Sequence, residues 1–129
     1  MKDETTIWLT YAQENLESAK ILVDSHLLNP CLQNIQQSVE KSLKALFIEH
    51  AIKLKKTHNI SELNNILCDH GYDIELPDED CEFLDSIYLP SKYPLGSVLP
   101  YYEPDETLCH QGISIAQHVF HAVTTMLHT

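Results

Sequence analysis

Gln36, Glu40 and Lys44 follow one another at intervals of four residues in the stretch QNIQQSVEKSLKALF, residues 33–47. Side chains at this spacing share one face of a helix, where an amide, a carboxylate and an ammonium group can bond in a row. Gln36 also falls inside the apolar stripe of the same helix, where an unpaired amide costs about 1–3 kcal/mol. These side chains either tie the helix to its neighbours, which we favour, or line a pocket. The stripe consists of Leu32, Ile35, Val39, Leu43, Leu46 and Phe47.

His58 is the second residue with two interpretations. It follows the segment KLKK, residues 53–56, which holds the only basic cluster of the chain. A histidine at the start of a helix commonly bonds a neighbouring carboxylate or carbonyl. Alternatively, His58 lies with Lys55 or Lys56 at the mouth of a cleft where a nucleotide phosphate can sit.

The histidines and cysteines do not predict a metal site. Only His118 and His121 have the i, i+3 spacing of a helical ligand pair, and catalytic zinc takes three protein ligands. The cysteines are far apart and form no CxxC pair, so we expect free thiols in or near the core. The remaining histidines of the last helix are His110 and His128, and the cysteines are Cys31, Cys68, Cys81 and Cys109.

The charge balance argues against a general nucleic-acid binder. There are 8 basic and 19 acidic residues, a net charge of −11, which repels phosphate backbones. All the basic residues are lysines, so the chain contains no arginine. With no apolar run of membrane-spanning length and no signal-peptide pattern at its start, we expect a cytoplasmic protein.

Hydrophobic periodicity and the placing of Gly and Pro predict one all-α domain, residues 1–129. We expect an antiparallel up-and-down bundle of about five helices. A second apolar strip, Ala45, Ile48 and Ile52, puts the second helix at the centre of the bundle or against another subunit. The expected helices span about 4–27, 30–54, 60–71, 78–89 and 105–128. A proline-rich loop is expected at 90–104. The tyrosines in or beside it either anchor the loop on the bundle or stack on a base; they are Tyr88, Tyr93, Tyr101 and Tyr102.

These features resemble the HEPN family (higher eukaryotes and prokaryotes nucleotide-binding). Ala12 and Ala19 match its Ala-x(6)-Ala pattern in the first helix. The second helix matches at Gln36, Gln37, Glu40, Lys41, Lys44 and Ala45, and the third segment at Thr57, His58, Leu63 and Leu67. The resemblance implies a helical bundle that is commonly dimeric and is often encoded beside a small nucleotidyltransferase as a toxin–antitoxin pair.

Some members of the family are ribonucleases that use an arginine followed by a histidine, and this chain cannot supply that pair. Where similar members read Ser-Arg-Tyr-Pro, it has Ser91-Lys92-Tyr93-Pro94. We therefore expect no catalytic residues, metal or cofactor other than a bound nucleotide, and a non-catalytic homodimeric partner of a nucleotidyltransferase. The alternative is a ribonuclease toxin with a degenerate site at His58 or Lys92. The candidate nucleotide contacts are Gln36, Glu40, Lys44, His58, Lys92 and Tyr93.

Overall fold

The computed structural model describes the backbone of residues 1–92 and 104–128, and their side chains except those of 88–92. Its elements are five α-helices, and the part of the chain so described contains no strand, which confirms the all-α prediction. They are α1 (Asp3–Asp24), α2 (Leu28–Glu49), α3 (Ile60–Asp69), α4 (Asp78–Lys92) and α5 (Glu106–Leu127).

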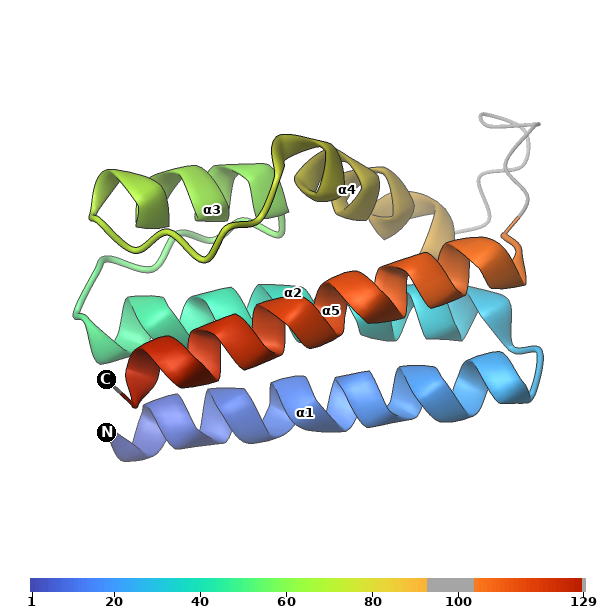
Figure 1. The fold of residues 1–129 in the computed structure, drawn as a ribbon, viewed down its shortest axis with the longest axis horizontal. Coiled ribbons are helices and arrows are strands. Elements are labelled where there is room, and N and C mark those ends of the chain that lie inside the picture. Colours follow the sequence, from blue (N-terminus) through green and yellow to red (C-terminus); the bar gives the residue numbers. More distant parts are fainter. Residues whose placement is uncertain (93–103, 129) are drawn as a thin grey trace.

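Helix α2 is the centre of the bundle. It packs against each of the other four helices, and α1 and α5 also contact one another. Both α2 and α5 run antiparallel to α1, so the two termini lie at the same end of the molecule (Figure 1). Of the two alternatives predicted for α2, a central place in the bundle or contact with another subunit, the structure has the first, since Ala45 is fully buried within this single chain.

The core is built from the apolar faces of all five helices. On α2, Ile35 is fully buried, and α5 approaches it at Gly112. A Cβ at Gly112 would lie only 2.8 Å from Cδ1 of Ile35, so the glycine permits this close packing of helices. The largest fully buried apolar side chains are Leu32, Ile35, Val39, Leu43, Leu46, Phe47, Ile60, Leu63, Leu67, Leu84 and Val119.

Three helices end in the same hydrogen-bonded motif. After α1, α2 and α3, one residue adopts a left-handed backbone and the next N–H bonds to a carbonyl five residues earlier, as in the Schellman motif. The left-handed residues are His26 (φ 58°), Ala51 (φ 53°) and Gly71 (φ 89°). The three closing bonds join Leu27 to Leu22, Ile52 to Phe47 and Tyr72 to Leu67, each at 2.9 Å.

Several predicted boundaries were wrong. The first two helices end at Asp24 and Glu49 rather than near 27 and 54, because His26 and Ala51 close them without a glycine. Ile52 therefore lies beyond α2 and is not part of a helical strip. Helix α4 continues through Pro90 to Lys92, where a loop was expected from residue 90. Pro90 has no N–H, so it cannot donate to the carbonyl four residues earlier in this last turn of α4.

The cysteines are free thiols, as predicted, but their locations differ. Cys31, Cys81 and Cys109 are buried, whereas Cys68 is exposed on α3 and does not belong to the core. Among the residues described, no helix combines the length and the apolar character needed to cross a membrane.

Candidate functional site

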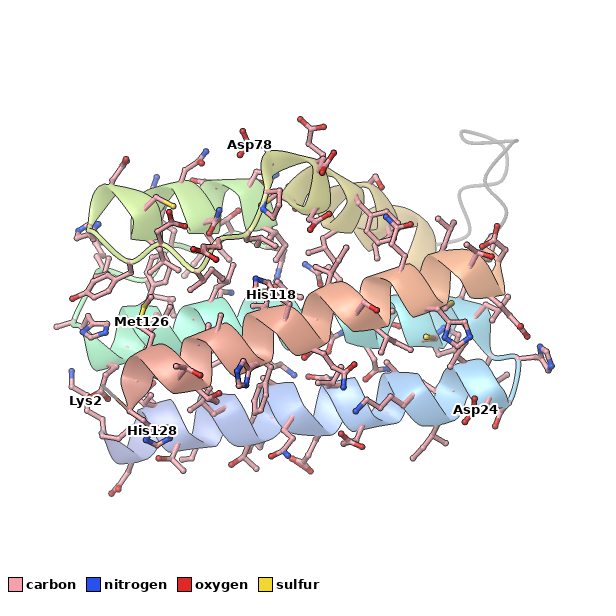
Figure 2. The ribbon with its side chains drawn as sticks, viewed as in Figure 1. Lys2, Asp24, Asp78, His118, Met126 and His128 are labelled. Carbon is pink, nitrogen blue, oxygen red and sulfur yellow. The ribbon has the colours of Figure 1, made fainter. Side chains whose placement is uncertain are left out.

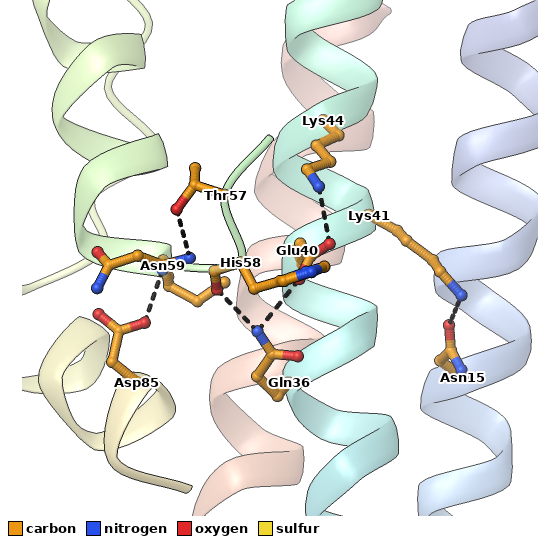
Figure 3. Close-up of polar contacts among 10 residues, drawn as sticks. Asn15, Gln36, Glu40, Lys41, Lys44, Thr57, His58, Asn59 and Asp85 are labelled. Atoms are coloured by element: carbon orange, nitrogen blue, oxygen red, sulfur yellow. Dashed lines mark hydrogen bonds and ion pairs between the residues drawn. The ribbon is translucent and has the colours of Figure 1, made fainter. Parts of the chain in front are cut away.

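Glu40 is the centre of a polar network between α2 and the start of α3. Its Oε2 accepts a hydrogen bond from Nζ of Lys44 at 2.8 Å, and its Oε1 lies 2.9 Å from Nδ1 of His58 (Figure 3). Glu40 and Lys44 are buried, with 8% and 7% of their surfaces exposed. Both carboxylate oxygens are thus engaged by groups of the protein itself.

Gln36 completes the network from one turn earlier on α2. Its Nε2 donates to the backbone carbonyl of His58 at 3.0 Å and to Oε1 of Glu40 at 3.3 Å. Gln36 is 1% exposed, so these bonds remove the cost of burying its amide group. The bonded row expected from the i, i+4 spacing is therefore present on α2, and it extends to His58 on the loop before α3.

The segment that carries His58 is fixed by bonds at the beginning of α3. The hydroxyl of Thr57 accepts from the N–H of Asn59, and Oδ1 of Asn59 caps the helix by accepting from the N–H of Glu62 at 2.7 Å. Asp85 of α4 accepts from the N–H groups of Ile60, at 2.6 Å, and Ser61, at 3.1 Å. A carboxylate at this position satisfies N–H groups that the helix itself leaves unpaired.

The electrostatics of the network favour an ionised Glu40. Burial alone would raise the pKa of this carboxyl, but the hydrogen bonds and charges of Lys44 and His58 outweigh that effect and lower the pKa below its ordinary value. Lys44 also lies 6.0 Å from the ring centroid of Trp8, a cation–π distance. The buried charges therefore have partners on α2, on α1 and on the loop before α3.

Lys41 points to the other side of α2, toward α1. Its Nζ donates to Oδ1 of Asn15 at 2.8 Å and lies 5.8 Å from the ring centroid of Tyr11. Burial lowers the pKa of Lys41, while the carboxylates of Glu40 and Glu14 partly oppose that effect. Lys41 thus links α1 to α2 and does not join the network around Glu40.

The arrangement of Glu40 and His58 could serve general-base chemistry. A carboxylate bonded to one ring nitrogen orients a histidine and stabilises its protonated form, which suits a general base. The side chain of His58 is 56% exposed, so the ring can be reached from solvent. No arginine exists in the chain to clamp a phosphate beside it.

The basic cluster lines a separate cavity. Residues 52–56 and Ile66 of α3 line an open pocket of about 530 Å³, and the three lysines of the cluster, Lys53, Lys55 and Lys56, all border it. His58 does not line this cavity, so the expected grouping of His58 with Lys55 or Lys56 in one cleft is not found here. His70, at the end of α3, takes part instead, and sequence reasoning missed it.

The two remaining candidate nucleotide contacts lie outside the part of the chain whose side chains are described. Lys92 ends α4, but its side chain is not described, and Tyr93 lies among residues 93–103, which are outside the described part of the chain.

On α5, Nε2 of His118 lies 3.2 Å from the carbonyl oxygen of Ile74 and 3.3 Å from that of Glu75 (Figure 2). Within residues 1–92 and 104–128, side chains of His, Cys, Asp and Glu form no group of three that could hold a metal.

Comparisons with known proteins agree with this architecture. The model of the HEPN domain family matches residues 5–126. The crystal structure of TT1696 from Thermus thermophilus has a TM-score of 0.79 at 23% identity, covering 96% of this chain and 98% of that one. The structure of ST0689, an archaeal HEPN homologue, has a TM-score of 0.70 at 26% identity, covering 98% of each chain. A comparison with curated protein sequences found no match.

Proposed function

Because this chain belongs to the HEPN domain family, we propose that it is a non-catalytic, cytoplasmic partner of a small nucleotidyltransferase in a two-component system of the toxin–antitoxin type. The observation that carries the non-catalytic part is the absence of arginine from the whole chain. Without that residue, the Arg–His pair of the ribonuclease members cannot form. The net charge of −11 also disfavours binding of an RNA substrate.

The network around Glu40 supports a structural role for most of the candidate site. Gln36, Glu40 and Lys44 are buried and bonded to one another or to His58, so they hold the loop before α3 against α2. His58 alone among these four has a side chain that is mostly exposed. Any nucleotide contact made by this set therefore falls to the His58 ring.

Exposed apolar side chains on and beside α1 support a homodimer. Ile7 and Tyr11 lie one helical turn apart on α1 and are each at least half exposed, as are Ile21 and Leu27 further along the chain. Neighbouring exposed apolar side chains such as the first two favour an association surface. Light scattering at micromolar concentration should give the mass of two chains. The Ile7→Ser/Tyr11→Ser variant should shift toward the monomer, and a strictly monomeric parent would contradict the proposal.

Co-expression tests the partnership. Sequencing the reading frames that flank the gene shows whether a small nucleotidyltransferase is encoded beside it. The two chains, with a tag on one, should co-purify in a fixed ratio and elute as one complex. A flanking nucleotidyltransferase that remains separate at micromolar concentration would contradict the proposed role.

A ribonuclease acting through His58 is the second candidate, favoured by the 2.9 Å contact between its Nδ1 and Glu40. Purified protein incubated with single-stranded RNA and transfer RNA distinguishes the two functions. We expect no turnover, because no arginine holds the scissile phosphate. Turnover that His58→Ala abolishes would reverse this conclusion in favour of the enzyme.

A further inference from the structure

Cys31 and Cys109 are two buried thiols that meet where α2 and α5 begin. Each is the fourth residue of its helix, counted from Leu28 in α2 and from Glu106 in α5. The two helices run in the same direction, so their starts lie at the same end of the bundle (Figure 1). Both side chains are fully buried in the common core. The fold thus brings together two cysteines that are far apart in the sequence.

The two sulfur atoms belong to a short chain of hydrogen bonds. The thiol of Cys31 donates to Sγ of Cys109. The thiol of Cys109 in turn donates to the backbone carbonyl oxygen of Leu28, which lies 3.8 Å from Sγ. A covalent bond between the two sulfur atoms therefore requires only that a hydrogen-bonded pair approach to bonding distance.

The shared hydrogen bond makes the two thiols chemically unequal. Burial, and then the bond that it donates to Cys109, raise the pKa of Cys31 to about 12. Burial also raises the pKa of Cys109, but the bond from Cys31 opposes that effect because it stabilises the Cys109 thiolate. Since the thiolate is the nucleophilic form of a cysteine, Cys109 is the one that reacts first.

We propose that Cys31 and Cys109 are a redox-sensitive pair, which hydrogen peroxide converts into a disulfide that joins α5 covalently to α2. The Cys109 thiolate attacks one oxygen of the peroxide, the O–O bond breaks, and the other oxygen leaves as water. The sulfur of Cys31 then attacks the resulting sulfenic acid, so the S–S bond forms and the S–O bond breaks, releasing a second water. Two thiols and one peroxide thus give one disulfide and two waters, and each sulfur gives up one electron to the peroxide.

The position of the pair at two helix starts gives a small oxidant a route to it. Helix ends open locally more readily than helix centres, and opening of the first turns of α2 and α5 exposes both thiols. A disulfide that forms in this way and is reduced again by thiols is typical of redox sensing in a reducing compartment. The proposal goes beyond the partnership with a nucleotidyltransferase and does not depend on it.

Oxidation of the full chain with millimolar hydrogen peroxide at neutral pH tests the pair. Peptide mapping without reduction should recover one cross-linked product that contains Cys31 and Cys109. The Cys68→Ser protein, which lacks the exposed thiol, should lose the mass of two hydrogens under the same treatment. Its melting temperature should rise by about 5–10 °C, because the disulfide closes a long loop of the unfolded chain. Dithiothreitol should reverse both changes.

Two alanine variants separate the pair from a general reaction of buried thiols. Cys31→Ala should abolish the rise in melting temperature and leave Cys109 as a sulfenic acid that dimedone traps. The matched control, Cys81→Ala, removes another buried thiol and should leave the yield of the cross-linked peptide within twofold of the parent. Melting curves before oxidation show whether each variant is folded, and the mapping of the parent decides the matter without either variant. Absence of the Cys31–Cys109 peptide from the parent, a cross-link between Cys68 and Cys81 in its place, or a disulfide that lowers the melting temperature would each overturn the proposal.

Discussion

His58 and Glu40 are 18 residues apart in the chain, and Nδ1 of the histidine lies 2.9 Å from Oε1 of the buried carboxylate. The contact joins the loop before α3 to the central helix, and Lys44 binds the other oxygen of Glu40 at 2.8 Å. A partly exposed histidine is thus coupled to a buried ion pair. The stability of the fold should depend on the charge of Glu40.

Glu40→Gln should lower the free energy of unfolding by about 2–3 kcal/mol at neutral pH, because it leaves the buried ammonium of Lys44 without its counter-charge. The pKa of Glu40 is lower in the folded state, so its contribution is complete above the unfolded value of about 4.3. That contribution is lost as the pH falls through the folded pKa. Urea unfolding between pH 3 and 7 should therefore show that the difference in free energy of unfolding between the parent and Glu40→Gln becomes smaller below about pH 4. A gap that does not depend on pH would contradict the ionised pair.

Gln36→Ala should lower the melting temperature by about 3–5 °C, equivalent to about 1 kcal/mol in a domain of this size. The substitution removes the amide that donates to the carbonyl of His58 and to Glu40. Gln37→Ala is the matched control, since its half-buried amide lies outside this network. Equal melting of the Gln36→Ala protein and the parent, with loss of nucleotide binding, would instead assign Gln36 to a ligand site.

Local contacts are the part of this site that the sequence could predict. Gln36, Glu40 and Lys44 lie on one helix, so their spacing alone brings them together. Asp85 could not be predicted as a partner of Ile60 and Ser61, because it lies 25 and 24 residues away and any acid of an acidic chain could serve. His70 was missed for a similar reason: it meets residues 52–56 only because α3 packs beside them.

The ends of the helices were also only partly predictable from the sequence, and substitutions there can test the observed backbone. Gly71 was predicted correctly as a stop, but His26 and Ala51 adopt the same left-handed backbone without glycine. Such a backbone costs a non-glycine residue about 1–2 kcal/mol, which exceeds the extra chain entropy of glycine. Ala51→Gly should therefore stabilise the fold by about 0.5–1 kcal/mol, measured by urea unfolding. Gly71→Ala should destabilise the fold, because alanine is strained at φ 89°. No atom lies within 4 Å of the added Cβ, so backbone strain is the only cost. Destabilisation by Ala51→Gly would mean that the left-handed turn is absent in solution.

The four thiols should differ in reactivity. Burial raises the pKa of Cys31 to about 12 and that of Cys81 to about 11, and it also raises the pKa of Cys109. Cys68 is exposed, although burial and the nearby Asp73 raise its pKa as well. The native protein should release one equivalent of thionitrobenzoate from Ellman's reagent at pH 8, more slowly than free cysteine does. The other three should react only in denaturant, because a thiolate is disfavoured in the core and the reagent cannot reach it. Cys68→Ser should remove the native reaction, and two or more reactive thiols in the folded parent would contradict the buried positions of Cys31, Cys81 and Cys109.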